Sequence, residues 1–184
     1  CPLAALKLTE FPLSGGARNS SFENYVNSMN ASGNTMHDAG MIWGARFLSP
    51  TGIFAADNSN APNDFNISRH IVFMTDGDMS AYDQVYGAYG YQKLDGRVAA
   101  TSADNASLTD VHNRRLEMLC NAVKGRGITV WVIGFRNQSE GNIQAPLQGC
   151  ASSSNHWMMA YTQAQLTQKF KDIAKNIGGL RVSK

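Results

Sequence analysis

The chain has 184 residues, of which 43% are hydrophobic, and its formal net charge of +2 comes from 16 basic and 14 acidic side chains. This length allows one domain with a hydrophobic core, and the scattered basic residues do not favour a nucleic acid as the partner. Because no apolar run approaches about 18 residues and no charged segment precedes a short apolar one, we expect neither a membrane span nor a signal peptide in these residues.

The first part of the chain predicts loop and then two helices. Residues 1–19 are rich in proline and glycine, which predicts extended chain and loop. Ser20 and Glu23 form a capping-box pattern ahead of a short helix that ends near Gly33, with an apolar stripe of Phe22, Tyr25, Val26 and Met29. A second helix is predicted over residues 34–50, with Thr35 as its N-cap and Asp38 at the third helical position.

The most informative stretch is residues 69–78, RHIVFMTDGD. Its continuous apolar run, residues 71–74, is typical of a strand that helices cover on both faces, and therefore predicts a parallel sheet. In open α/β sheets the ligand crevice lies at the carboxyl ends of the strands. We therefore expect Asp76 to be presented there, on a tight turn made by Gly77.

The second half of the chain predicts a crossover between parallel strands. Tyr82, Tyr86 and Tyr89 recur at helical spacing after the first strand, and a polar stretch without periodicity follows at residues 99–110. A helix that ends at Gly125 then leads to a second apolar strand at residues 127–135, and a short third strand is predicted at residues 156–160. A final amphipathic helix, capped by Thr162 and Gln165, ends at residues 178–179.

Three cysteines are present, and they have no zinc-site spacing. Cys120 is predicted on the buried side of the helix beside the second strand, and Cys150 follows the loop that leaves this strand. We therefore predict a Cys120–Cys150 disulfide, with Cys1 free or paired upstream. A low content of charged residues, 16%, and plentiful Asn, Ser, Gly and Thr fit an exported protein.

The pair of Asp76 and Thr35 has two interpretations on chemistry alone. A carboxylate at a strand end and a hydroxyl at a helix start are oxygen ligands that suit Mg²⁺. The alternative is that Thr35 serves only as an N-cap and Asp76 only as a turn residue.

Four segments in this order resemble the later part of a von Willebrand factor type A domain: GNTMHDAGMIWGARFLSPTGIF, RHIVFMTDGDMS, GITVWVIGF and LQGCASSSNHWMMA. More narrowly, they are similar to the domain of TadG-like proteins of tight-adherence (Flp-type) pilus assembly. The resemblance implies a Rossmann-like α/β fold in which residues 1–184 are the C-terminal portion of a single domain that lacks its first strands.

The resemblance also implies a metal-ion-dependent adhesion site. In that family the site draws on a DxSxS loop, a threonine and the aspartate of a TDG turn, so Thr35 and Asp76 match its second and third parts. No DxSxS is present in this sequence. We therefore expect Mg²⁺, Mn²⁺ or Ca²⁺ to bind this chain weakly or not at all.

An enzymatic alternative is that Asp76 and Asp78 are the DxD pair of a Mg²⁺-dependent haloacid-dehalogenase-type phosphohydrolase, in which the first is the nucleophile and the second a general acid. This interpretation leaves Thr35 without a role. It also places the motif in mid-chain, although such domains normally open with it.

The resemblance favours a non-enzymatic, protein-binding function in pilus assembly. It implies an exported protein of the periplasm or cell envelope, anchored by an upstream segment, with other pilus assembly or envelope components as partners. Within this chain, Tyr82, Tyr86 and Tyr89 are the candidates for partner contact. The alternative for residues 79–98 is a helix docked on the sheet.

Overall fold

The chain divides into two compact units, Cys1–Asn34 and Thr35–Lys184. The computed structural model describes residues 3–6, 9–12, 19–30, 33–61, 65–143 and 145–179. Cys1, for which the sequence predicts a free thiol or an upstream partner, lies outside the described residues.

The first unit contains one helix, α1 (Ser20–Asn27), within its described residues. The N-cap is Asn19 and not the predicted Ser20, because Asn19 Oδ1 accepts hydrogen bonds from the backbone N–H groups of Ser21 at 3.0 Å and Phe22 at 3.2 Å. The predicted apolar stripe is not buried, since Phe22, Val26 and Met29 are all more than 40% exposed. Within the unit, Phe22 contacts the ring of Phe11.

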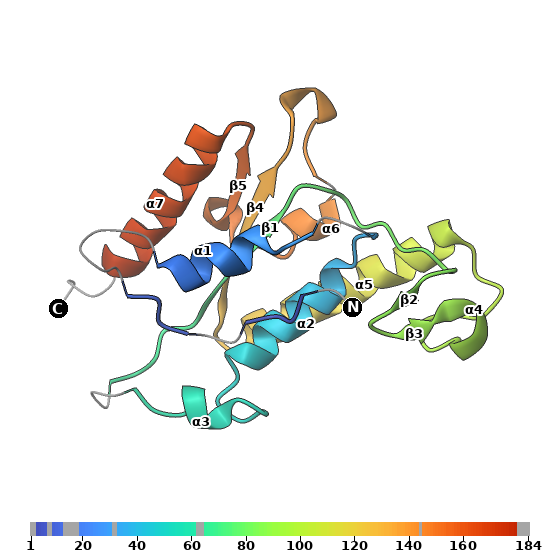
Figure 1. Cartoon of the computed structure of the whole chain (residues 1–184), viewed down its shortest axis with the longest axis horizontal. Helices are drawn as coiled ribbons and strands as arrows, with labels where there is room; N and C mark the ends of the chain where they lie inside the picture. Colours follow the sequence, from blue (N-terminus) through green and yellow to red (C-terminus); the bar gives the residue numbers. More distant parts are fainter. Residues whose placement is uncertain are drawn as a thin grey trace. The chain divides into compact units, whose positions relative to one another are not determined.

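The second unit is built on a three-stranded parallel sheet in the order β1 (His70–Thr75), β4 (Thr129–Phe135) and β5 (Trp157–Ala160), as Figure 1 shows. The prediction of a mixed α/β fold with a parallel sheet is therefore confirmed. Thr75 lies beside Gly134 in the register, and Phe135 lies beside Ala160. The carboxyl ends of the three strands consequently meet at one edge of the sheet.

Helices pack on both faces of this sheet. On one face lie α2 (His37–Phe47) and α5 (Asn105–Gly125), which run side by side, whereas α7 (Gln163–Gly179) packs on the other face against β5 (Figure 1). The larger core cluster, on the side of α2 and α5, includes Met41, Ile71, Leu116, Cys120, Val130 and Val132. The smaller cluster, on the side of α7, has Trp131, Ile133 and Ile173 at its centre.

The prediction that helices cover both faces of the first strand is wrong for β1. Ile71 is 8% exposed and faces the larger core, but Val72 and Met74, on the opposite face, are 37% and 49% exposed. The reason is that α7 packs against β5 and β4, and the cluster it forms there does not include Val72 or Met74. The apolar run therefore predicted the strand correctly, but it did not predict how much of the strand is buried.

The long connection between β1 and α5 also differs from expectation. No helix carries the three tyrosines; instead β2 (Tyr86–Gly87) and β3 (Gly90–Tyr91) form a small antiparallel hairpin that leads into α4 (Gln92–Asp95). Gly90 has a φ of 91°, which only glycine adopts readily, and this turn interrupts any helix. The polar stretch at residues 99–110, which has no periodicity in the sequence, is helical from Asn105, because Asp104 caps α5 by accepting from Ser107 N at 2.8 Å.

The remaining short elements are α3 (Ala55–Asn58), η1 (Gln138–Glu140), α6 (Ala145–Gln148) and η2 (Ser154–His156). The predicted Cys120–Cys150 disulfide is present and joins α5 to the turn that follows α6, across a sequence separation of 30. A disulfide is compatible with an exported protein. Within the ranges described above, none of the helices has both the length and the apolar character needed to cross a membrane.

Candidate functional site

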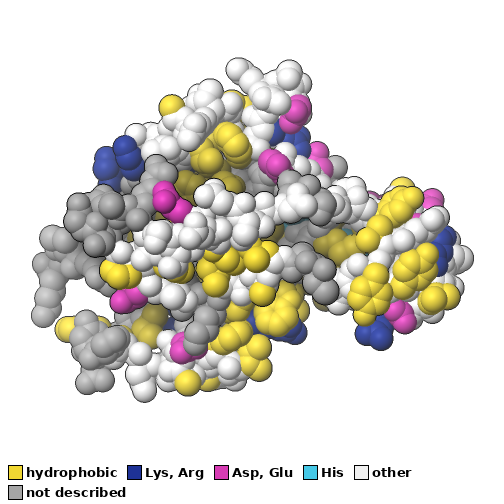
Figure 2. Space-filling view, in the orientation of Figure 1, with side chains coloured by type: hydrophobic (Ala, Val, Ile, Leu, Met, Phe, Trp, Pro, Cys, Tyr) yellow, Lys and Arg dark blue, Asp and Glu magenta, His cyan; other side chains and the backbone are white. Residues whose placement is uncertain are grey.

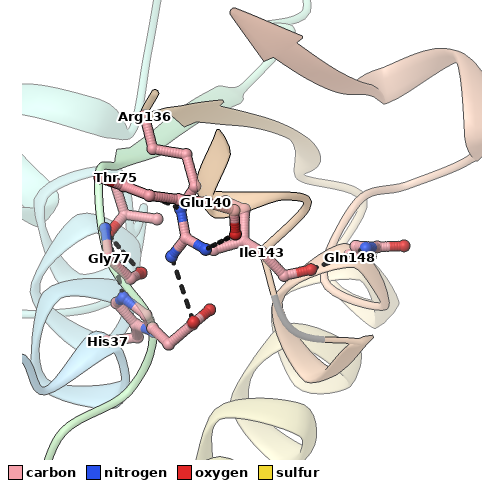
Figure 3. Close-up of polar contacts among 8 residues, drawn as sticks. His37, Thr75, Gly77, Arg136, Glu140, Ile143 and Gln148 are labelled. Carbon is pink, nitrogen blue, oxygen red and sulfur yellow. Dashed lines mark hydrogen bonds and ion pairs between the residues drawn. The ribbon is translucent and has the colours of Figure 1, made fainter. Parts of the chain in front are cut away.

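The carboxyl edge of the sheet brings together residues that are far apart in the sequence. The turn at residues 76–78 leaves β1, Arg136 follows β4 directly, and Thr35 and His37 precede or begin α2. Figure 3 shows His37, Thr75, Gly77 and Arg136 around this turn. This is the position at which parallel α/β folds place ligands.

Thr35 is attached to this edge through its backbone. It forms an isolated antiparallel bridge with Ser80, in which Thr35 N donates to Ser80 O at 3.1 Å and Ser80 N donates to Thr35 O at 2.9 Å. A Cβ atom on Gly77 would lie 4.0 Å from Thr35 Oγ1, so the hydroxyl faces the turn. The structure therefore brings Thr35 next to the turn that carries Asp76.

The predicted role of Thr35 as an N-cap is wrong. The N-cap position of α2 belongs to Met36, and no side chain caps this helix. The backbone of Thr35 is held in the bridge with Ser80, which leaves the threonine outside the helix. Asp38, predicted at the third helical position, points into the protein interior instead and is fully buried.

The turn of residues 76–78 is held by contacts that run from His37 to Thr75 and from Thr75 to Gly77. The Thr75 hydroxyl donates to Gly77 O at 3.1 Å and accepts from Gly77 N at 3.3 Å, and His37 Nε2 lies 3.1 Å from the same oxygen. We assign His37 Nε2 as the donor in its contact, because the single hydroxyl proton of Thr75 is then used in the hydrogen bond to Gly77 O. Burial lowers the pKa of His37 below its ordinary value, although the charges of Asp78 and Asp38 oppose this shift. A neutral histidine thus holds the turn, which is a structural role.

Arg136 is the site residue that sequence reasoning missed. Its side chain is only 8% exposed, and Nη2 forms an ion pair of 3.1 Å with Asp78 Oδ2. Its Nη1 donates to Glu140 O at 3.4 Å, while Nε is buried without a hydrogen-bond partner. The available signal was its position directly after the second predicted strand, which places it at the same sheet edge as Asp78.

The two predicted metal ligands, Asp76 and Thr35, have chemistry that suits a divalent cation. Asp76 is exposed and Thr35 is half-buried, and both offer oxygen atoms, which Mg²⁺ and Ca²⁺ prefer. Over the part of the chain that the structure describes, no three His, Cys, Asp or Glu side chains gather in a way that could hold a metal.

The three tyrosines predicted to contact a partner separate into two groups. Tyr82 and Tyr86 are 40% and 80% exposed, whereas Tyr89 turns inward. Its hydroxyl donates to Asp38 Oδ2 at 3.0 Å, and Arg115 lies over its ring at 4.7 Å. Tyr89 therefore anchors the hairpin and is not part of the exposed surface.

Asp38 is the centre of this anchor. Besides Tyr89, His112 Nδ1 lies 2.9 Å and Arg115 Nε 3.1 Å from Asp38 Oδ2, while Oδ1 is buried and unpartnered. Burial alone would raise the pKa of Asp38, but the hydrogen bond and charge of His112, with the hydrogen bonds of Arg115 and Tyr89, lower it below the ordinary value. An ionised carboxylate in the interior thus joins α2, α5 and the hairpin.

Comparison with known proteins does not place the chain in a family. No family model matches the sequence. No curated protein matches it either. A solved structure with some likeness is proximal thread matrix protein 1 from the mussel byssus, which is 16% identical with a TM-score of 0.46, over 82% of this chain and 28% of that one.

Proposed function

We propose that this chain is a non-enzymatic, protein-binding domain of the von Willebrand factor type A class, in an exported protein related to TadG-like components of tight-adherence pilus assembly. The observation that carries the proposal is the backbone bridge between Thr35 and Ser80, which sets the Thr35 hydroxyl against the turn of residues 76–78. Two segments that the resemblance assigns to one adhesion site thus lie together at the carboxyl edge of a parallel sheet. The fold class supports this proposal, and the family assignment rests on the quoted motifs.

A metal ion would have a limited role in this chain. Thr35 and Asp76 are the residues that would hold Mg²⁺, Mn²⁺ or Ca²⁺, and the ion would offer a carboxylate of the partner an open coordination position. Asp78 is less available, because it is paired with Arg136. Two protein ligands give weak affinity, so binding of the partner must rest mainly on other contacts.

The contact surface that we propose is the exposed apolar part of the hairpin segment. Tyr82, Val85, Tyr86 and Leu94 are between 40% and 80% exposed. Figure 2 shows hydrophobic side chains gathered over this part of the molecule. Tyrosine is enriched at protein interfaces because it combines a large apolar ring with a polar tip. The buried anchor of Tyr89 on Asp38 holds the segment in place, which reduces the entropy lost on binding.

We do not propose the phosphohydrolase alternative as a second function. Its general acid would be Asp78, and the carboxylate of Asp78 forms an ion pair with Arg136. The carboxylate that would act as the acid is thus already engaged by a guanidinium. Thr35, which the alternative leaves unused, lies against the turn.

The test is a binding measurement with an activity control. Purified pilus assembly and envelope components of the source cell are passed one at a time over the immobilised chain, in Mg²⁺ or in EDTA. We expect at least one component to bind, Tyr86→Ala to weaken binding, and Met118→Ala, at an exposed apolar position of α5 outside the hairpin segment, to leave it nearly unchanged. Binding to none of them would contradict the proposal. So would Mg²⁺-dependent hydrolysis of para-nitrophenyl phosphate that Asp76→Asn abolishes, because it would favour the enzymatic alternative.

A further inference from the structure

A groove lies at the opposite end of the sheet from the candidate site. It has a volume of about 840 Å³ and runs between the C-terminal halves of α2 and α5, beside Arg69 and Ile128, which directly precede β1 and β4. Its apolar wall consists of Ile42, Ala45, Leu119, Ala122, Val123 and Ile128. The volume lies within the range of roughly 300–1,000 Å³ that is typical of small-molecule sites.

The charges around this groove have one sign. Arg46, Arg69 and Arg126 line it, and no Asp or Glu is among the described residues that do so. None of the ion pairs between described residues involves these three arginines. Arg46 instead stacks over the ring of Trp43, with its Cζ atom 4.9 Å from the ring centroid. The groove therefore combines an apolar wall with cationic side chains that lack carboxylate partners among the described residues.

Arg69 has a fixed place in this arrangement. Its Nε donates to Leu48 O at 3.0 Å and its Nη2 donates to Asn58 O at 2.5 Å. Both acceptors are neutral backbone carbonyls, so the positive charge of Arg69 is held in position without being neutralised. Arg46 and Arg126 are exposed and can turn toward a ligand at the rim.

We propose that this groove binds a single-chain anionic amphiphile such as an alkyl carboxylate. The alkyl tail lies along Ile42, Leu119 and Val123, and the headgroup accepts hydrogen bonds from Arg46 and Arg126. A planar guanidinium can form two parallel hydrogen bonds with a carboxylate. The headgroup therefore lies at the rim of the groove, beside these arginines. This binding is independent of the protein-binding function proposed above, because the groove and the turn of residues 76–78 lie at opposite ends of the strands.

A purely structural explanation for two of the arginines makes a different prediction. Arg46 lies in the last turn of α2 and Arg126 caps α5, positions at which a basic side chain offsets the negative end of the helix dipole. If this were their only role, the groove would not distinguish an anionic amphiphile from a cationic one.

The experiment is titration calorimetry of the whole chain with decanoate, below the concentration at which it forms micelles, and with decyltrimethylammonium as the control of opposite charge. We expect decanoate to bind and decyltrimethylammonium not to bind. Arg46→Gln and Arg126→Gln should each weaken decanoate binding by roughly tenfold, because each removes a charge-assisted hydrogen bond. Arg114→Gln, which removes an exposed arginine of α5 outside the groove, is the matched control and should have no effect.

A second pair of variants tests the groove without removing any arginine. Ala122 is exposed on α5 and lines the groove, so a longer side chain is tolerated by the fold. Ala122→Glu should abolish decanoate binding, because its carboxylate pairs with Arg126 one helical turn away. Ala122→Lys should preserve binding. The proposal would be overturned if the two amphiphiles bound equally well or if decanoate did not bind. It would also be overturned if none of these substitutions changed the affinity for decanoate.

Discussion

The hydroxyl of Tyr89 donates a hydrogen bond of 3.0 Å to Asp38 Oδ2, across 51 positions of sequence. The same carboxylate oxygen is contacted by His112 and Arg115 of α5. Asp38 thereby connects the first turn of α2 with the middle of α5 and with the hairpin that carries the exposed tyrosines. The stability of the fold and the position of the proposed contact surface thus depend on one buried carboxylate.

Asp38→Asn should destabilise the protein strongly. The substitution removes the negative charge that pairs with partly buried Arg115 and bonds to buried His112, so we expect the free energy of unfolding to fall by about 3 kcal/mol. Urea denaturation followed by circular dichroism measures the change. Asp110→Asn, at an exposed position of α5, is the control and should change it by less than about 0.5 kcal/mol. Equal effects of the two substitutions would show that Asp38 is not the anchor.

Tyr89→Phe and Tyr86→Phe form a matched pair, because each removes one hydroxyl group. Tyr89 bonds to an ionised carboxylate, so its loss should lower the free energy of unfolding by about 1.5 kcal/mol. Tyr86 is 80% exposed, and its substitution should leave stability nearly unchanged. Denaturation curves recorded under the same conditions measure both changes. A larger loss of stability for Tyr86→Phe than for Tyr89→Phe would contradict this prediction.

Stability should decrease as the pH falls below about 6.5, the ordinary pKa of histidine. Because burial lowers the pKa of His37 in the folded state, the unfolded chain takes up a proton at a higher pH than the folded chain does. The unfolded state therefore binds more protons in this range, and the free energy of unfolding falls until the pH reaches the lowered pKa of the folded state. The lowered pKa of His70, which burial also causes, acts in the same direction.

His37→Gln tests this assignment, since glutamine can still donate to Thr75 but does not titrate. We expect the variant to lose less stability than the wild type between about pH 6.5 and 5, with His70 responsible for the remainder. Below the ordinary value of 3.8 for Asp38 both proteins should lose further stability, because the lowered pKa of Asp38 stabilises the folded state only while this group is ionised. Identical pH profiles above pH 5 would rule out His37 as a contributor.

Loss of the Cys120–Cys150 disulfide should lower the free energy of unfolding by about 3–4 kcal/mol, because the bond restricts the unfolded chain over a separation of 30 residues. The double variant Cys120→Ala/Cys150→Ala and the reduced wild-type protein should unfold at similar urea concentrations. Added reductant should not affect the double variant further. A large effect of reductant on that variant would mean that Cys1, the remaining cysteine, forms an intermolecular disulfide that stabilises the fold.

Mg²⁺ binding to this chain should be roughly millimolar or weaker, because the candidate site offers two protein ligands, Thr35 and Asp76. Asp76→Ala and Thr35→Ala should each remove any binding that titration calorimetry detects, while Thr35→Ser, which keeps the hydroxyl, should preserve it. Thr35→Ala should leave the free energy of unfolding nearly unchanged, since the bridge to Ser80 uses backbone atoms and no cap is lost. Micromolar affinity that survives Asp76→Ala would place the site elsewhere.

The amino-acid sequence by itself determined the elements that depend on local pattern. The apolar runs at residues 71–74 and 127–135 identified β1 and β4, and the turn residues after β1 identified the edge of the sheet at which the candidate site lies. The disulfide could also be predicted, because the pattern placed Cys120 on the buried side of a helix and Cys150 beyond the neighbouring strand. Hydrophobic periodicity and turn chemistry act over a few residues, so a single sequence contains them completely.

Only the tertiary structure decided which side chains meet across long separations. The tyrosine spacing suggested a helix, but Gly90 turns the chain back as a hairpin, and this directs Tyr89 to Asp38 instead of to solvent. The ion pair of Arg136 with Asp78 likewise forms because β1 and β4 are neighbours in the sheet. An ion pair or a buried hydrogen bond depends on distances of a few ångströms between segments, and these distances are set by the packing of the whole sheet and its helices rather than by the residues adjacent in sequence.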